Sequence, residues 1–215
     1  MRLILDTTVL LNFARAERLE LLASLDVVVG ALVTTELRFW PPGTSRQGQP
    51  LELRAALPSA RPVALRGPEE ERLFVKLRDR LGAGEAEAAA IAHSRGFTLA
   101  TDDAAAHKIV GQELPQLEVS TTIRILSFLV ERGRLSQTEA EHVLGLMRQR
   151  GGRLPLVRIG PGPLARERQQ DGRPRSLSPG DKDKKPKHRA AASIPFLVKA
   201  APIFQTPRRD RGRGR

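Results

Sequence analysis

Over the first 150 residues, short apolar runs alternate with longer segments in which apolar residues recur at helical spacing. The short runs are bounded by polar, charged or Gly residues, which predicts buried strands at 3–5, 27–29, 97–100 and 117–119. The helical spacing and the residues suited to helix caps predict helices at about 9–25, 34–40, 69–81, 85–94, 103–110, 121–132 and 138–150. The stretch 41–68 is rich in Pro, Gly, Arg and Gln, which predicts an irregular connection with one helical turn near 51–57.

This alternation of strands and helices predicts an α/β protein with three α/β/α layers and a mostly parallel central sheet. The predicted domain covers residues 1–150. In sheets of this kind, ligands bind beyond the carboxyl ends of the strands. We therefore expect the functional residues directly after the predicted strands and near the starts of the helices.

Residues 151–215 differ from the first 150 in composition and in charge. They contain repeated Pro and Gly, few large apolar side chains, and 17 basic against 5 acidic residues, whereas residues 1–150 hold 19 of each. The whole formal net charge of +12 therefore lies in 151–215. This composition predicts a disordered basic tail. Non-specific binding to RNA phosphates and a passive extension are both open as its role.

Other features of the sequence exclude several classes of protein. The chain has no Cys, which rules out a disulfide framework, a thiolate zinc site and a cysteine nucleophile. It has no apolar run long enough for a transmembrane helix, and Asp6 comes too early for a secretory signal. We therefore expect a soluble, cytoplasmic protein without a membrane partner.

Acidic residues stand at the places where an α/β sheet binds its ligands. Asp6 follows the first predicted strand, and Asp102 and Asp103 follow the strand predicted at 97–100. Glu36 and Glu85 are expected in the first turns of their helices, which face the same edge of the sheet. Carboxylates that converge repel one another and stay ionised at neutral pH when a divalent cation joins them. All-carboxylate ligation suits Mg²⁺ or Mn²⁺, and such a site suits metal-assisted hydrolysis of a phosphodiester.

Four segments carry these acids in order: LILDTTVL at 3–10, TTEL at 34–37, GEAEAAAIA at 84–92 and LATDD at 99–103. In this order and at these spacings, they resemble the motifs of PIN-domain proteins, in particular the VapC-like toxins of toxin–antitoxin pairs. The resemblance covers about residues 1–150 and does not extend to the tail. It implies a PIN-like fold and a Mg²⁺- or Mn²⁺-dependent ribonuclease that acts on RNA. It also implies a small cognate antitoxin and a homodimer.

The resemblance also assigns roles to individual residues. It implies a catalytic set of four acids: Asp6, Glu36, Glu85 and Asp103. Asp102 competes with Asp103 for the fourth place, so the metal ligands are expected among Asp6, Glu85, Asp103 and Asp102. Glu87 is a rival of Glu85 for the third place. Polar side chains expected to line the substrate site are Thr7, Asn12 and Thr101.

Other interpretations of the same residues stay open at this point. Asp6 or either of the two adjacent aspartates can serve as a helix cap, and Glu36 and Glu85 can be ordinary helix residues. A non-catalytic RNA-binding protein can keep the same fold, although it gains nothing from a negative pocket. A housekeeping RNA-processing nuclease would have the same acids without an antitoxin. A phospho-acceptor receiver domain would carry its acidic pair after the first strand, where Asp6 stands alone.

Overall fold

The computed structural model describes residues 2–157 and 159. Five strands form one sheet in the order β3-β2-β1-β4-β5, and every neighbouring pair is parallel. The strands are β1 (Arg2–Leu5), β2 (Asp26–Gly30), β3 (Arg61–Val63), β4 (Thr98–Ala100) and β5 (Val119–Ser120). The predicted parallel sheet is therefore confirmed, with the first strand at its centre.

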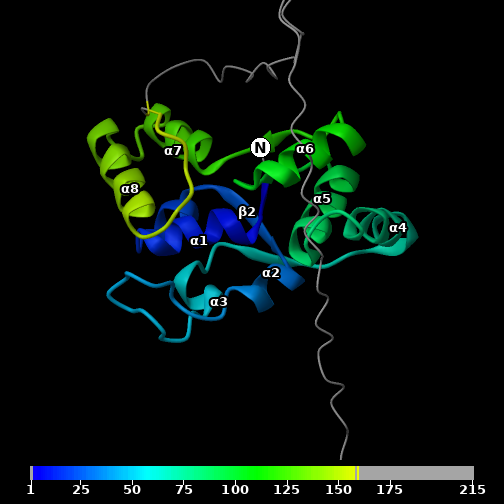
Figure 1. Cartoon of the computed structure of the whole chain (residues 1–215), viewed down its shortest axis with the longest axis horizontal. Helices are drawn as coiled ribbons and strands as arrows, with labels where there is room; N and C mark the ends of the chain where they lie inside the picture. The colour runs from blue at the N-terminus through cyan, green and yellow to red at the C-terminus, as the bar shows by residue number, and fades with distance from the viewer. Residues whose placement is uncertain (1, 158, 160–215) are drawn as a thin grey trace, which may run out of the picture. The chain divides into compact units, whose positions relative to one another are not determined.

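Helices cover both faces of this sheet. The helices are α1 (Thr7–Arg15), the 3₁₀ helix η1 (Leu19–Ser24), α2 (Ala31–Glu36), α3 (Leu53–Ala56), α4 (Gly67–Arg78), α5 (Ala83–Arg95), α6 (Ala104–Glu113), α7 (Thr122–Glu131) and α8 (Gln137–Gln149). Helices α1, α7 and α8 lie on one side, and α4, α5 and α6 lie on the other (Figure 1). The predicted three layers are confirmed. Among the described residues, no helix is long and apolar enough to cross a bilayer.

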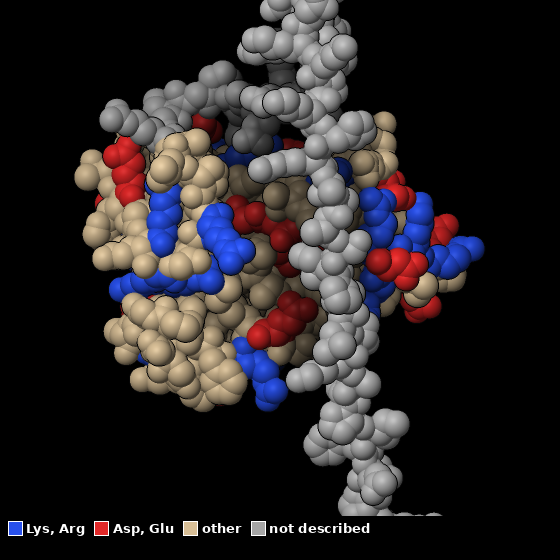
Figure 2. Space-filling model, in the orientation of Figure 1, with Lys and Arg blue, Asp and Glu red and all other residues tan. Residues whose placement is uncertain are grey.

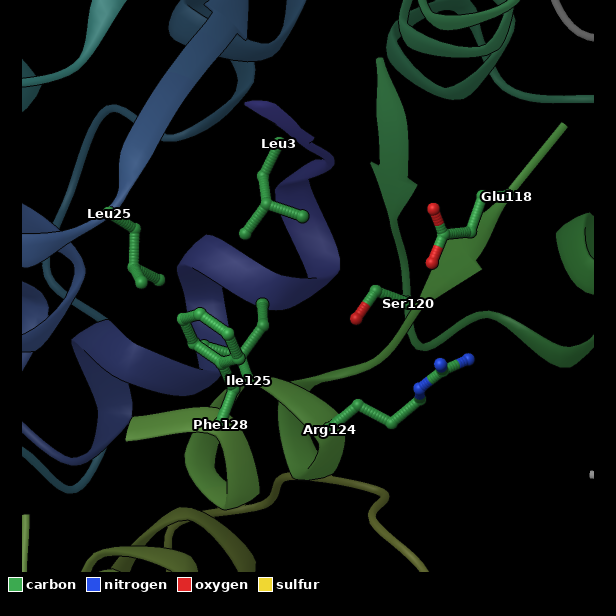
Figure 3. A pocket seen from close by; sticks show the side chains of 7 residues that line it. All are labelled: Leu3, Leu25, Glu118, Ser120, Arg124, Ile125 and Phe128. Atoms are coloured by element: carbon green, nitrogen blue, oxygen red, sulfur yellow. The ribbon is translucent and has the colours of Figure 1, made fainter. Parts of the chain in front are cut away.

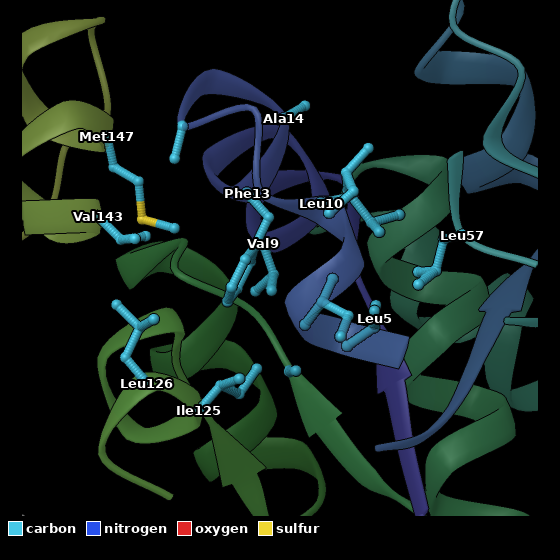
Figure 4. Close-up of a cluster of buried hydrophobic side chains, with 14 of the residues drawn as sticks. Leu5, Val9, Leu10, Phe13, Ala14, Leu57, Ile125, Leu126, Val143 and Met147 are labelled. Atoms are coloured by element: carbon cyan, nitrogen blue, oxygen red, sulfur yellow. The ribbon is translucent and has the colours of Figure 1, made fainter. Parts of the chain in front are cut away.

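The two cores arise from the alternation of side chains along the central strands. Leu3 and Leu5 point into the core under α1, α7 and α8, whereas Ile4 points into the core under α4, α5 and α6. In the first core, Phe13 of α1 meets side chains of α7 and α8 (Figure 4). In the second core, the alanines of α5 let this helix lie close to the sheet around Ile91. Because β1 is buried on both faces, the position of its carboxyl end is fixed.

The helix predicted over 9–25 is wrong in its second half. Helix α1 ends at Arg15, and Glu17 adopts the left-handed conformation with φ of 57°. The backbone N–H of Arg18 donates to the carbonyl of Phe13, which closes the helix end in the manner usually associated with Gly. The Glu17 carboxylate accepts hydrogen bonds from Ser45 and Arg150, and these contacts hold the unusual turn.

The predicted start of the helix at Thr34 or Thr35 is also wrong. Helix α2 begins at Ala31 and ends at Glu36. The hydroxyls of Thr34 and Thr35 donate to carbonyls one turn earlier instead of capping a helix start. Glu36 therefore stands at the carboxyl end of its helix and not in its first turn.

The stretch 41–68 contains one strand that the sequence did not predict. Strand β3 is three residues long, includes Pro62 and pairs with β2 at the edge of the sheet. Pro removes a backbone donor and is tolerated at such an edge, although it argues against a strand in the sequence. The predicted helical turn near 51–57 is confirmed as α3.

The packed chain continues past residue 150, the predicted end of the domain. The N–H of Gly152 donates to the carbonyl of Met147, and Leu154 and Ile159 are buried in the first core. The remainder of the predicted tail, 160–215, lies outside the described residues.

A nearly buried ion pair joins α4 to α5. The guanidinium of Arg95 donates from Nε to Glu70 Oε1 at 2.7 Å and from Nη2 to Glu70 Oε2 at 2.8 Å. The backbone N–H of Arg66 donates to the same carboxylate at 2.6 Å. Hydrogen bonding to Arg95 holds the pKa of Glu70 below its ordinary value.

We predict that Glu70→Gln destabilises the protein by about 2 kcal/mol at pH 7, because Arg95 then keeps its charge without a carboxylate. Since the pKa of Glu70 is lowered in the folded state, the stabilisation is complete above its ordinary value of 4.5 and is lost as pH falls through the lowered value. Urea denaturation at several pH values measures this difference. Lys76→Gln, which removes one side of an exposed pair, is the control and should have little effect. Equal stability of Glu70→Gln and wild type at pH 7 would contradict the prediction.

Candidate active site

The site lies where the strand order of the sheet changes direction. In the order β3-β2-β1-β4-β5, the connections run outward from β1 on one side and from β4 on the other. Such a switch point leaves a crevice beyond the carboxyl ends of the two central strands. Asp6 follows β1 and Thr101 follows β4, and the N–H of Asp6 donates to the Ala100 carbonyl at 2.9 Å. The two segments therefore meet at this crevice.

Asp6 is held by hydroxyl groups from both segments. It caps α1, and its Oδ2 accepts hydrogen bonds from Thr8 Oγ1 at 2.7 Å, the Thr8 N–H at 3.3 Å and Thr101 Oγ1 at 3.0 Å. The residue is 1% exposed, and its burial raises the pKa of the carboxyl group. The predicted site residue Thr101 thus supports Asp6 directly. Thr8 does the same and was not among the predicted site residues, although its position two residues after Asp6 suited a cap.

The other predicted acids lie around Asp6. Burial raises the pKa of Glu85, and the negative charges of Asp6, Asp103 and Glu36 raise it further. These four acids come from four separate segments of the chain, and the threonines beside two of them link these segments. Thr7 donates to Glu36, while Thr101 donates to Asp6 and accepts a hydrogen bond from the Asp103 N–H. Figure 2 shows acidic side chains gathered in a hollow near the middle of this face, with basic side chains around it.

Glu36 reaches this group from the carboxyl end of α2. Its carboxylate accepts a hydrogen bond from the hydroxyl of Thr7, another predicted site residue. Gly84 permits this approach, since a Cβ there would lie 2.9 Å from Glu36 Oε1 and 3.1 Å from a methyl group of Val33. A side chain at position 84 would therefore clash with Glu36 and Val33, which explains the Gly before Glu85. Glu85 itself accepts a hydrogen bond from the Gly82 N–H at 3.0 Å.

The two adjacent aspartates have different surroundings. Asp103 caps α6 by accepting a hydrogen bond from the Ala106 N–H at 2.8 Å, and its charge acts on Glu85. Asp102 instead accepts hydrogen bonds from the N–H of Thr122 at 2.9 Å, from the Thr122 hydroxyl, and from Asn12 Nδ2 at 2.8 Å. Asp102 thus joins the start of α7 to α1, whereas the carboxylate of Asp103 contacts the start of its own helix.

Asn12 lies in the same buried connection and not in an open cleft. It is 3% exposed, donates to Asp102 and accepts a hydrogen bond from Arg15 Nη1 at 3.0 Å. Gly152 covers it, since a Cβ there would lie 2.9 Å from Asn12 Oδ1. The structure therefore buries this predicted substrate residue beside Asp102.

Glu87 has a separate role at the start of α2. Its Oε2 accepts a hydrogen bond from the Leu32 N–H at 2.8 Å, and the Ala31 N–H also contributes. Gly30 makes room for this cap, because a Cβ there would lie 2.4 Å from Glu87 Oε2. Burial raises the pKa of Glu87. Glu87 therefore caps the start of α2, which has no cap from its own segment. No pattern in the sequence indicated that Glu87 would contact α2.

The donor chemistry of the four acids fits a hard divalent cation. They offer oxygen ligands alone, and their mutual repulsion is the kind of strain that a cation relieves. Within residues 2–157 and 159, no three His, Cys, Asp or Glu side chains lie close enough to hold one ion as they stand. Ligation would therefore require side-chain movement in the hollow.

A separate pocket lies between the sheet and α7, beside β1 and β5 (Figure 3). Apolar side chains of β1, of α7 and of Leu25, which precedes β2, form most of it, and the full lining is Leu3, Leu25, Glu118, Ser120, Arg124, Ile125 and Phe128. None of the predicted site residues belongs to it. This pocket is thus distinct from the acidic hollow.

The parallel sheet with helices on both faces defines an α/β protein. A family model described as PIN domain matches residues 2–158, and the chain belongs to the PIN-domain family. The match confirms the resemblance that the ordered motifs indicated.

Among solved structures, the chain is similar to a chain in the crystal structure of VapBC2 from Rickettsia felis bound to a DNA fragment from their promoter. The sequence identity is 18%, the similarity covers 56% of this chain and 98% of that chain, and the TM-score is 0.38. A comparison with curated proteins finds no match.

We predict that Asp6→Asn is at least as stable as wild type at pH 7 in a chelator. Asn keeps an oxygen that can accept from Thr8 and Thr101, and it removes a buried charge that other acids surround. Adding Mg²⁺ or Mn²⁺ should raise the free energy of unfolding of wild type, because the cation binds the native state, and should raise that of the variant much less. Chemical denaturation with and without the cation measures both effects.

The control for this prediction is Glu113→Gln, which removes an acid whose partners are Lys76 and Arg80. This variant should keep the full gain from the cation. An equal gain in Asp6→Asn would show that the cation binds at another place.

Proposed function

We propose that the protein is a metal-dependent endoribonuclease that hydrolyses phosphodiester bonds of RNA. The observation that carries this proposal is the gathering of Asp6, Glu36, Glu85 and Asp103 at the carboxyl edge of the central strands. A site with this much negative charge repels a polyanion unless a cation stands between the two. Membership of the PIN-domain family supports the same activity.

Mg²⁺ or Mn²⁺ would be held by Asp6, Glu85 and Asp103. When bound, the ion supplies charge stabilisation for the phosphate oxygens and lowers the pKa of an attacking water. Asp102 is occupied by Thr122 and Asn12, so we assign it a supporting role.

The chain's own side chains prepare the site before substrate binds. The hydroxyls of Thr8 and Thr101 fix the orientation of the Asp6 carboxylate, and the hydroxyl of Thr7 fixes that of Glu36. Helix caps restrain Glu85 and Asp103 at the starts of α5 and α6. These contacts restrain the carboxylates at the hollow, and the side-chain movement that ligation of one ion requires would start from these restrained positions.

We predict that Asp6→Asn lowers cleavage of single-stranded RNA at least about 100-fold, since it removes one of the charged groups on which the site depends. Asp103→Asn should lose more activity than Asp102→Asn, because the carboxylate of Asp102 is occupied by hydrogen bonds from Thr122 and Asn12. Cleavage of a labelled oligonucleotide in Mg²⁺ or Mn²⁺ measures these rates, and unfolding curves confirm that each variant is folded.

Full activity of wild type in excess chelator would contradict the metal dependence. Retention of activity by Asp103→Asn with loss in Asp102→Asn would contradict the assignment of the fourth acid. RNA binding without cleavage under all divalent ions would favour a non-catalytic RNA-binding protein with this fold.

We further propose that a small cognate antitoxin inhibits this nuclease. The proposal rests on the resemblance of the motifs to those of VapC-like toxins. Physically, an acidic hollow open to solvent can be blocked by an Arg or Lys side chain that occupies the position of the cation. This mode of inhibition needs no change in the fold.

We predict that expression of this chain alone slows growth and that co-expression with a neighbouring small gene restores it. Asp6→Asn should remove the toxicity without the second gene, which ties the effect to the acidic site. Growth curves of the three strains provide the measurement. Equal growth with and without the small gene, for a nuclease shown to be active, would leave a housekeeping ribonuclease without an antitoxin.

A further inference from the structure

Residues 38–51, which follow Glu36, form a loop whose two ends are joined by backbone hydrogen bonds. The Leu51 N–H donates to the Arg38 carbonyl at 2.8 Å, the Trp40 N–H donates to the Gln49 carbonyl at 3.0 Å, and Phe39 and Pro50 form an antiparallel bridge. These contacts join the two ends of the 38–51 loop. The side chains at its base are therefore presented from a fixed backbone.

Phe39 projects from this base into solvent. It is 57% exposed, and it is the one aromatic residue among the large apolar side chains that are well exposed in the described part of the chain. Its neighbour Trp40 is buried, with the guanidinium of Arg46 stacked 4.5 Å from its ring centre. The phenyl ring of Phe39 is therefore exposed beside the buried indole ring of Trp40. It offers a flat apolar surface to a ligand from a fixed backbone.

The charge of the 38–51 loop is opposite to that of the hollow beside it. The loop contains Arg38 and Arg46 and no acidic residue. Both arginines are exposed, and within the described residues neither forms an ion pair. The N–H of Arg38 donates to the Glu36 carbonyl at 3.2 Å, so the cationic loop begins directly at the acidic site.

We propose that the 38–51 loop binds single-stranded RNA, with a base stacked on Phe39 and phosphates contacted by Arg38 and Arg46. This inference rests on the proposed nuclease function. Aromatic stacking combined with cationic contacts is the usual means of holding single strands without sequence readout. Phe39 follows Glu36 by three residues, so their Cα atoms are at most roughly 11 Å apart. A strand that lies across the acids therefore reaches the loop.

The sequence supplies a reporter beside the proposed contact. The chain has one Trp and no Tyr, so the intrinsic fluorescence excited at long wavelength comes from Trp40 alone. The full chain is titrated in a chelator with a short single-stranded RNA, a condition that prevents metal-dependent cleavage. RNA bound at the loop changes the emission of Trp40, whereas RNA bound at a distant part of the chain leaves it unchanged.

The variants separate stacking from charge and from general surface effects. Phe39→Ala should weaken binding at least about 5-fold, and Phe39→Tyr, which keeps the ring, should restore most of it. Arg38→Gln should weaken binding and reduce its dependence on salt. Val75→Ala, which trims another exposed apolar side chain on α4, is the matched control and should bind as wild type does. In cleavage assays, Phe39→Ala should raise KM with little change in kcat.

The outcomes distinguish this inference from the proposed function. If wild type cleaves RNA and Phe39→Ala has unchanged affinity and KM, the loop site is refuted and the nuclease proposal stands. If RNA changes the Trp40 emission and Phe39→Tyr rescues binding, but no divalent ion supports cleavage, the nuclease proposal is refuted and the loop site stands. If Phe39→Ala binds RNA normally but no longer binds the antitoxin, the loop is a protein contact and our inference is wrong.

Discussion

The burial of the Asp6 carboxylate at the end of the central strand is the constraint on which the rest of the site depends. Two hydrophobic cores hold β1 from opposite faces, and the hydroxyls of Thr8 and Thr101 then fix the carboxylate itself. A charge in this position is costly, as the raised pKa of Asp6 indicates. The buried carboxylate lies beyond the carboxyl ends of β1 and β4, where the reversal of strand order leaves a crevice.

The other predicted site acids lie near the same edge of the sheet, and the negative charge of Asp6 is among the causes that raise the pKa of Glu85. Glu36, Glu85 and Asp103 come from different helices, and each is restrained by a hydrogen bond that its own segment or α1 provides. Glycines at 30 and 84 let α5 carry two carboxylates close to α2, one for the cap and one for the site. A neutral domain that concentrates negative charge in a single hollow, with a cationic loop beginning at its edge, suits a site for a cation and a polyanion together.

Much of this could be predicted because the signals are local. Asp6 follows a strand in the sequence, and the apolar runs that became β1 and β4 showed which acids share an edge. The different surroundings of Asp102 and Asp103 could not be predicted, because the partners of Asp102 are Thr122 and Asn12 from other elements. The start of α2 could not be predicted either, since its cap comes from Glu87, which is 55 residues away. Glu17 gave no sign of a left-handed turn, because that conformation is held by Ser45 and Arg150.

The central claim is that the convergent acids form one cation site. Anomalous diffraction from a crystal of the full chain grown with Mn²⁺ tests it most directly, because the map locates the ion and its ligands without reference to activity. The account predicts a peak among the carboxylates of Asp6, Glu85 and Asp103, with oxygen ligands and bound water. A map with no peak in the hollow, or with a peak held by Asp102 instead, would contradict it.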